Sequence, residues 1–324
     1  MSFFSALAAM DFWAFVLVIA GINAIFVLGL QLQAGTTGLL NFGHVGFMAA
    51  GAYAMGLLLA NGITLWLALP AGLLAGAVFG LVVGIPTLRL RSDYFAITTI
   101  AAGEIFRIVM LNNPGSDPED PGSGTGGSEG LRGASGPWKQ FNRDVIAWFH
   151  DHLSWDINRL APLLVLVWVV TALVGVFLWY LSRSPWGRVL KAIRENEDAT
   201  AALGKNVFVY KLQALALGAT IAALAGVMFT FQTTTLYPDD FLPIVTFTGF
   251  AILILGGVGS YVGVVAGTLV ISFIQAITRF VDFPINPEKA AALRWVLIGL
   301  IIMAIMAFRP QGLFGKKEEL HLDV

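Results

Sequence analysis

Two ionisable side chains interrupt an otherwise apolar stretch and are the first candidates for chemistry. Glu104 and Arg107 lie three residues apart in SDYFAITTIAAGEIFRIVML (92–111), so a helix would place them on one face, where they can pair. Charges at membrane depth are costly and usually face a bundle interior or water. The pair fits a polar stretch of a translocation path, or a self-neutralising pair near a helix end, from which Arg107 reaches the interface.

Asn41 and His44 flank Gly43 at the start of another apolar stretch, with Gly38 and Gly46 close by. This pattern predicts an irregular helix entry, which survives at membrane depth only where protein or water covers it. Free N–H groups and half-helix ends of this kind can bind a zwitterionic solute. A packed turn with all its polar groups satisfied explains the same residues at least as well.

The segment SPWGRVLKAIRENEDATAALGKNVFVYKLQAL (184–215) alternates charged and apolar positions with helical periodicity. Ser184 followed by Pro185 is typical of a helix start, and Gly204 after a run of small residues is typical of a helix end. The pattern predicts a two-part amphipathic helix between two membrane spans. Such a helix suits docking into a cytoplasmic ATPase and suits equally a position on anionic lipid headgroups.

Several other kinds of chemistry are excluded by the residues present. The Gly-rich GGVGSYVGVVAG (256–267) lacks the Lys-Ser/Thr pair of a nucleotide P-loop, so we interpret it as a tight turn between helices. The chain has no cysteine, and its four histidines form no metal-ligand cluster with acids. We therefore expect no enzymatic activity, no catalytic residue, no metal and no cofactor. Any ATP hydrolysis must come from another polypeptide.

Composition indicates a protein solvated by lipid. Of 324 residues, 57% are hydrophobic and only 12% are charged, and the mean hydropathy is +0.79. That charged share is about half of what a soluble domain carries. The net charge of −1 argues against nucleic acid as a partner.

Long, unalternating apolar runs exclude a β-barrel and predict an all-α polytopic membrane protein. Since a span needs about 20 residues, we expect about nine spans, within a range of about eight to ten, in a single domain over residues 1–324. Glycines at spacings of four residues, such as Gly72, Gly76 and Gly80, let these helices pack closely. The predicted spans are 12–30, 43–60 (with or without a partly inserted stretch from Leu32), 65–84, 93–111, 163–181, 212–231, 244–255, 262–280 and 293–308.

Basic residues set the expected orientation. With nine alternating spans, Arg89 and Arg91, the basic loop 182–210, and Arg309 with its following lysines all fall on one side. Positive-inside bias places that side, including the C-terminus, in the cytoplasm. The N-terminus and the loop 112–160 then lie outside.

The outer loop changes character along its length. Residues 113–136 are rich in Gly, Pro, Ser and Asp, which favour turns. Residues 143–153 can form a short helix at the membrane interface, where Trp is favoured. The aromatic side chains of this second part are Trp138, Phe141, Trp148, Phe149 and Trp155.

Several stretches together resemble the M-type permease of the high-affinity branched-chain amino-acid ABC importers, in the same order from about residue 12 to residue 315. They are GLLNFGHVGFMAAGAY (38–53), the 92–111 stretch, TGGSEGL (125–131), the 184–215 segment, and the 256–267 turn with the closing FRPQGLFG (308–315). The outer loop after TGGSEGL is longer and richer in Trp than is usual in that family, which leaves open an altered contact with a binding protein.

The resemblance implies a multi-pass permease of the bacterial inner membrane that works by alternating access. Its expected partners are a second permease subunit, two cytoplasmic ABC ATPases, and a periplasmic or extracellular binding protein that delivers an amino acid. The family's coupling loop corresponds to 182–210 here. Its expected ATPase-coupling residues are Arg188, Lys191, Arg194, Glu195, Glu197, Ala201 and Gly204. The candidates for the translocation path are Asn41, His44, Glu104 and Arg107.

Three alternatives remain at this stage. A urea or amide permease of the same family shares much of the pattern, although the GEIFR ending of 92–111 looks more like the amino-acid branch. A stand-alone secondary transporter would need more ionisable residues deep in the bundle. An intramembrane enzyme would need a convergent polar or metal constellation.

Overall fold

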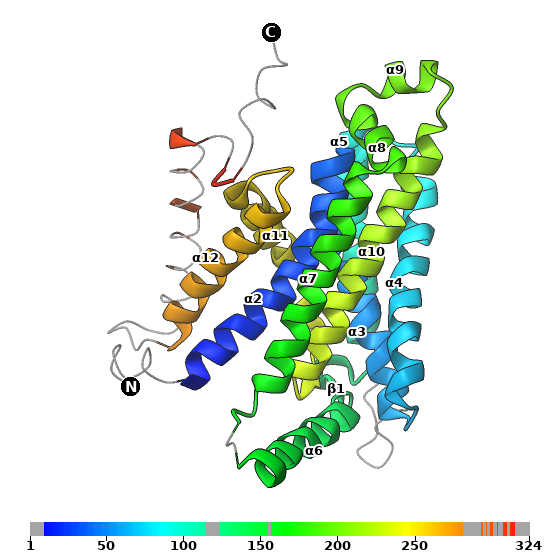
Figure 1. Cartoon of the computed structure of the whole chain (residues 1–324). Helices are drawn as coiled ribbons and strands as arrows, with labels where there is room; N and C mark the ends of the chain where they lie inside the picture. Colours follow the sequence, from blue (N-terminus) through cyan, green and yellow to red (C-terminus); the bar gives the residue numbers. More distant parts are fainter. Residues whose placement is uncertain are drawn as a thin grey trace.

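Helices make up most of the described chain, and the longer ones run between the two ends of the molecule (Figure 1). The computed structural model describes residues 10–113, 124–154 and 157–280, with isolated positions between 293 and 314. Within these residues, six helical segments are long and apolar enough to cross a membrane. They are Met10–Thr36, Leu65–Thr87 (α4), Ser92–Asn112 (α5), Ala161–Arg183 (α7), Val207–Gln232 (α10) and Pro238–Gly256. The all-α polytopic prediction is confirmed.

The first of these segments joins α2 (Met10–Leu30) to a π-helical turn, η1 (Gln31–Thr36). The last joins the 3₁₀ turn η3 (Pro238–Phe241) to α11 (Ile244–Gly256). Two further helices complete the described bundle, α3 (His44–Ala60) and α12 (Tyr261–Phe280). Each predicted span up to residue 280 therefore corresponds to a helix. Some predictions fall outside the described residues, namely those for most of 293–308, for Trp155, and for Lys316 and Lys317.

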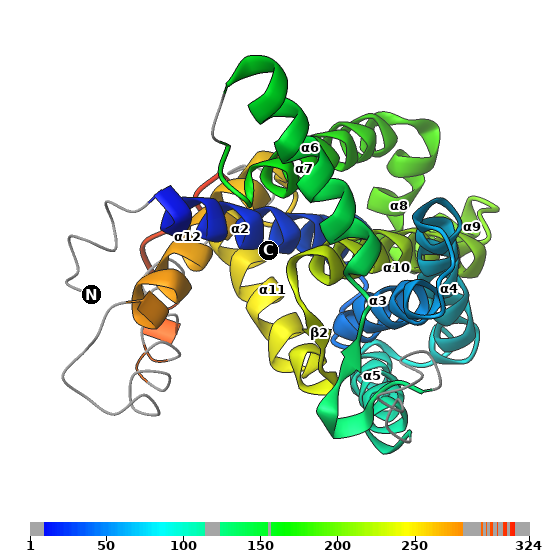
Figure 2. The same cartoon turned by 90° about the horizontal axis from the view of Figure 1, so that it is seen from below.

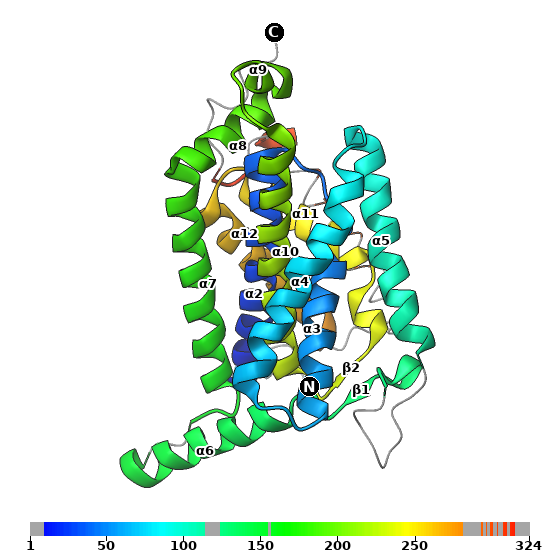
Figure 3. The same ribbon diagram turned by 90° about the vertical axis from the view of Figure 1, so that its right-hand side faces the viewer.

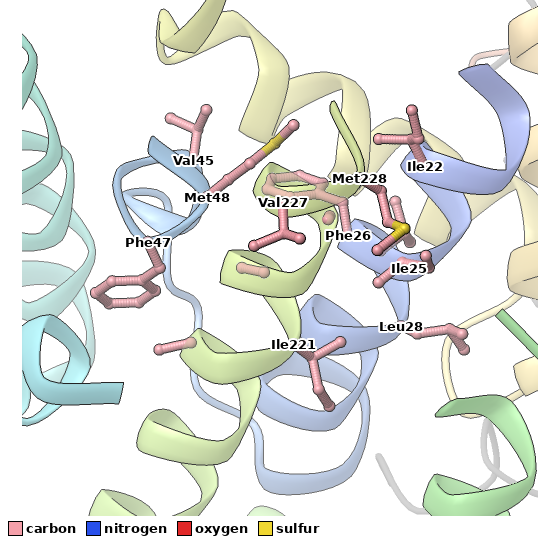
Figure 4. Packing of buried hydrophobic residues seen from close by; sticks show 14 of the residues in the cluster. Ile22, Ile25, Phe26, Leu28, Val45, Phe47, Met48, Ile221, Val227 and Met228 are labelled. Atoms are coloured by element: carbon pink, nitrogen blue, oxygen red, sulfur yellow. The ribbon is translucent and has the colours of Figure 1, made fainter. Parts of the chain in front are cut away.

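The core lies where α2, α3 and α10 meet, and α4 packs on the α3 and α10 side. Side chains of α2, α3 and α10 converge in one apolar cluster, which includes Phe26, Phe47, Met48, Ile221 and Met228 (Figure 4). In the end-on view of Figure 2, α4 and α5 lie at the rim. These rim helices and α7 expose apolar side chains that lipid would solvate. Examples are Leu67, Leu74, Val82, Ile97, Ile105, Val165, Leu173 and Val176.

Glycine allows the central helices to approach one another closely. A Cβ atom placed on Gly51 of α3 would lie 2.6 Å from Cα of Ala223 in α10. A Cβ on Gly226 of α10 would overlap the carbonyl oxygen of Met48, and one on Gly76 of α4 would overlap the side chain of Ala223. Only hydrogen fits at these three contacts, as the close spacing of small residues predicts.

The two ends of the bundle carry different elements (Figures 1 and 3). One end, which we call the basic end, carries α8 (Pro185–Glu195), α9 (Glu197–Ala202) and the α4–α5 turn. Its described basic residues include Arg89, Arg91, Arg183, Arg188, Lys191, Arg194, Lys205, Lys211 and Arg309.

The opposite end, which we call the α6 end, carries α6 (Gly136–Leu153), the 3₁₀ turn η2 (Gly127–Glu129) and a pair of short strands. β1 (Leu131–Arg132) pairs antiparallel with β2 (Thr235–Leu236), and the side chains of Leu131 and Leu236 are buried. This pairing was not predicted, because strands of two residues show no periodicity. It fastens the outer loop to the end of α10.

The glycine contacts yield a stability prediction. Gly226→Ala forces a methyl group against Met48 and should lower the free energy of unfolding by roughly 1–3 kcal/mol, since overpacking displaces backbone. Gly175→Ala in α7 is the matched control, because a Cβ there meets no atom within 4 Å. Thermal unfolding in detergent should show a lower midpoint for Gly226→Ala alone. Equal midpoints would contradict the close approach of α3 and α10.

Candidate functional site

The helix α8 begins at a sharp bend after α7. Ser184 caps it, and its Oγ accepts a hydrogen bond from Gly187 N at 3.2 Å, with Pro185 at the first helical position. Leu190 and Ile193 are buried against the bundle. The helix is therefore amphipathic, as the sequence predicts, and its charged face points away from the core.

A second cap starts α9 directly after α8. Asn196 adopts an extended conformation that ends α8, and its Oδ1 accepts from Ala199 N at 2.9 Å. Gly204, with a φ of +78°, reverses the chain after α9, and Leu203 beside it is 80% exposed. Glu197 pairs with Lys211 of α10 and so ties α9 to the bundle.

The outward face of this helix pair is a mixed charged and apolar surface, which we call the α8–α9 surface. It consists of the exposed residues Arg188, Lys191, Glu195, Glu197, Asp198, Ala201, Leu203 and Gly204.

The sequence analysis did not predict the roles of Asn196 and Leu203. An Asn three residues before a run of small residues is nevertheless a recognisable signal for a helix N-cap.

Arg194 differs from the other predicted coupling residues because its side chain bonds to η1, which precedes α3. Its Nη1 donates to the carbonyl oxygen of Gly35 in η1 at 2.5 Å. Gly38, with a φ of +77°, packs beside it, and a Cβ there would lie 3.3 Å from Cγ of Arg194. Arg194 also lines a cavity of about 420 Å³ between α8, the α4–α5 turn and residues 37–39. The side chain of Arg194 therefore joins α8 to the end of α2.

The chain between η1 and α3 is a return segment (37–43), which leaves the helical conformation after Thr37. His44, which begins α3, lies beside α2, and its Nε2 donates to the carbonyl oxygen of Phe26 at 3.2 Å. Because helical turns continue from Phe26 to Thr36, the return segment descends roughly 15 Å alongside them. The bundle covers most of this irregular segment, although Gly38 and Leu40 are exposed.

Buried amide side chains hold the return segment in place. Asn41 Nδ2 donates to Oε1 of Gln33 at 2.9 Å, and Gln33 Nε2 donates to Leu215 O in α10 at 3.0 Å. Asn41 Oδ1 accepts from Gly43 N at 3.0 Å. Gln33 and Asn41 are both fully buried. Both ends of the Asn41 amide thus have hydrogen-bond partners within the protein. A packed turn requires this arrangement, whereas a site for a solute would leave polar groups free.

The start of α3 is enclosed by two other helices. Val45 N donates to Oγ1 of Thr246 in α11 at 3.0 Å, and a Cβ on Gly43 would overlap the carbonyl oxygen of Thr99 in α5. His44 Nδ1 is buried and has no hydrogen-bond partner among the described residues. His44 therefore keeps an unused acceptor at the point where α2, α3 and α10 meet.

Glu104 and Arg107 form an ion pair towards the α6 end of α5. Arg107 Nη2 lies 2.6 Å from Glu104 Oε1, and its Nη1 lies 2.8 Å from Oδ1 of Asp239 in η3. The Arg107 side chain is 13% exposed. The pair is self-neutralising, and with Asp239 it ties α5 to η3. In the described part of the chain, no hydrogen bond connects this cluster to Asn41 or His44.

The described residues contain no group of three or more His, Asp and Glu side chains that could hold a metal ion. Membrane transport subunits can combine a helical bundle, an amphipathic helix pair at one end and a largely buried irregular segment inside, as this chain does. The chain belongs to the family described as branched-chain amino acid transport system / permease component, whose profile matches residues 12–306.

The names of similar proteins agree with this assignment. The high-affinity branched-chain amino acid transport system permease protein LivM of Escherichia coli (strain K12) is 34% identical over 308 residues, which cover 91% of this chain and 69% of LivM. The probable branched-chain amino acid transport permease protein LivM of Methanocaldococcus jannaschii is 25% identical, with 95% of each chain covered. The ribose import permease protein RbsC of Haemophilus influenzae is 23% identical over 86% of this chain and 81% of its own length. No solved structure matches the chain.

The buried amide network yields a second prediction. Asn41→Leu keeps the size of the side chain but leaves Gln33 Oε1 and Gly43 N without partners, and each unpaired group costs about 1–3 kcal/mol. Asn112→Leu is the control, since Asn112 is exposed at the end of α5. We expect a lower thermal midpoint and lower yield of folded protein for Asn41→Leu only. Similar behaviour of the two variants would show that the network contributes little.

Proposed function

We propose that this chain is the pore-forming permease of an ATP-driven ABC importer for branched-chain or related amino acids. The observation that carries the proposal is the α8–α9 surface, in a chain of the branched-chain amino acid permease family. Two capped helices expose charged and small residues to a partner while Leu190 and Ile193 anchor them to the bundle. Such a surface fits the cleft of an ABC ATPase subunit.

In this proposal the basic end faces the cytoplasm and the α6 end faces outward, following positive-inside bias. By the same bias we propose a cytoplasmic C-terminus. Two hydrogen bonds join residues 313 and 314 to the α11–α12 turn. Leu313 N donates to Leu255 O at 2.9 Å, and Phe314 N donates to Gly256 O at 3.0 Å. Two ATPases dock at this end, a second permease subunit completes the pore, and a binding protein delivers substrate to the opposite end.

The proposed mechanism is alternating access driven through α8. Arg188, Lys191, Glu195, Glu197, Ala201 and Gly204 contact the ATPase. Arg194 transmits the displacement of α8 to Gly35, and so to the return segment and the start of α3. Asn41 and His44 lie on this moving entry, and Glu104 and Arg107 lie further along the path towards the outside. The chain itself performs no chemistry on the solute.

ATPase docking is tested by charge reversal on the α8–α9 surface. Arg188→Glu combined with Lys191→Glu should reduce co-purification of the ATPase at least about tenfold, because like charges face each other at the interface. Arg132→Glu combined with Arg143→Glu makes the same charge change at the α6 end and should leave co-purification unchanged. If the first variant co-purifies with the ATPase as well as the unmodified chain does, the ATPase does not dock on this surface.

Transmission through Arg194 is tested by separating binding from transport. Arg194→Gln should keep ATPase association but reduce amino-acid uptake in proteoliposomes about tenfold or more, because the bond to Gly35 O is lost. Arg188→Gln, which removes a charge from the exposed face, is the control for charge loss alone. If Arg194→Gln lowers association and uptake equally, Arg194 contacts the ATPase instead.

The same proteoliposomes test the substrate and the partners. Uptake of a branched-chain amino acid that requires ATP and the ATPase subunits supports the proposal. Uptake of urea or an amide in its place would identify the chain as the other branch of the family. Uptake by the purified chain alone would identify a stand-alone secondary transporter.

A further inference from the structure

The helix α6 has two chemically distinct faces. Counted from Trp138, the positions Phe141, Val145, Trp148 and Phe149 follow at spacings of three, seven, ten and eleven, which places all of them on one side of a helix. The opposite side carries the exposed residues Gln140, Arg143, Asp144, Ala147 and Asp151. We call the first side the aromatic face of α6.

The aromatic face begins as part of the bundle and then extends beyond it. Trp138 is buried and stacks on Phe231 at the end of α10, with ring centroids 4.6 Å apart. Further along α6, Phe141 and Trp148 on the same face are each 52% exposed. Figure 3 shows the later turns of α6 extending sideways past α7. The face that points at the bundle therefore continues over the region beside it, where lipid lies.

Other tryptophans place this end of the bundle at the membrane interface. Trp13 in the first turn of α2 and Trp66 in the first turn of α4 are both exposed at the α6 end, and Trp66 is 87% exposed. At the basic end, Trp179 and Tyr180 of α7 are exposed in the same way. Tryptophan and tyrosine gather at both membrane–water interfaces. Exposed tryptophans at the α6 end are therefore typical of an end at headgroup level, and α6 lies at that end (Figure 1).

We infer that α6 is an interfacial helix whose aromatic face is embedded in the lipid leaflet at the α6 end, beside α7. Phe141, Val145, Trp148 and Phe149 enter the boundary between headgroups and acyl chains, and the polar face contacts water. The polar face carries Arg143 with Asp144 and Asp151, so it offers no excess of positive charge for anionic lipid. Apolar burial provides the attraction, and a zwitterionic bilayer suffices.

The absence of cysteine makes the inference directly testable. Single cysteines at 140, 141, 144, 145, 147, 148 and 149 can be spin-labelled in the full chain, reconstituted in phosphatidylcholine nanodiscs. Labels at 141, 145, 148 and 149 should collide more with oxygen, which concentrates in lipid, than with a water-soluble nickel complex. Labels at 140, 144 and 147 should show the reverse, so the ratio should follow the helical period.

Two outcomes would overturn the inference. One is nickel accessibility at 141, 145 and 148 equal to that at 140, 144 and 147, because the aromatic face would then face water. The other is shielding of the aromatic face that occurs only when a purified extracytoplasmic binding protein is added, because the occupant would then be that protein. The test needs no ATPase and no transport, so its result is independent of the proposed function.

Discussion

Backbone polar groups that lie at membrane depth outside a helix must find partners inside the protein, because lipid offers none. The return segment at 37–43 is where this chain meets that constraint. Gln33 and Asn41 supply side-chain partners, and Gly43 lets the backbone press against Thr99 of α5. The position of this segment fixes where α3 begins, and α3 in turn organises α4, α5 and α10 around it.

Two arginines connect peripheral elements to the bundle at its opposite ends. Arg194 bonds α8 to the turn that precedes the return segment, and Arg107 bonds α5 to η3. Both use a guanidinium to reach across a gap between elements that are distant in sequence. The first lies beside the surface proposed for the ATPase, and the second lies at the end proposed for substrate entry. At the basic end this polar contact adds to the apolar packing of Leu190 and Ile193 against the bundle.

The apolar runs predicted the helices well, because lipid-facing and buried helix faces are both apolar and a span needs a fixed length. The sequence also indicated an irregular backbone around Asn41 and His44. It gave no sign that Gln33 is the partner of Asn41, since that pairing depends on how the chain turns back on itself. The π-helical turn at Gln31–Thr36 likewise leaves no periodic signature.

Charged residues were harder to assign than apolar ones. Arg194 has the spacing of a surface residue, yet its guanidinium bonds to Gly35, because the end of α2 happens to lie within reach. The roles of Arg188, Lys191 and Glu195 stay predictions, since their partner is another polypeptide. The sequence does not predict the strand pair β1–β2, because two residues per strand are too few to show alternation of polar and apolar side chains.

The glycine contacts between α3, α4 and α10 also limit how the protein can change shape. Gly51, Gly76 and Gly226 each meet a neighbouring helix at a spacing that admits only hydrogen, so sliding one helix along another would bring larger side chains into collision. These contacts therefore oppose shear between the three helices. They favour movement of the three helices as a unit, with the change of backbone angles in segments at its edge, such as the return segment before α3.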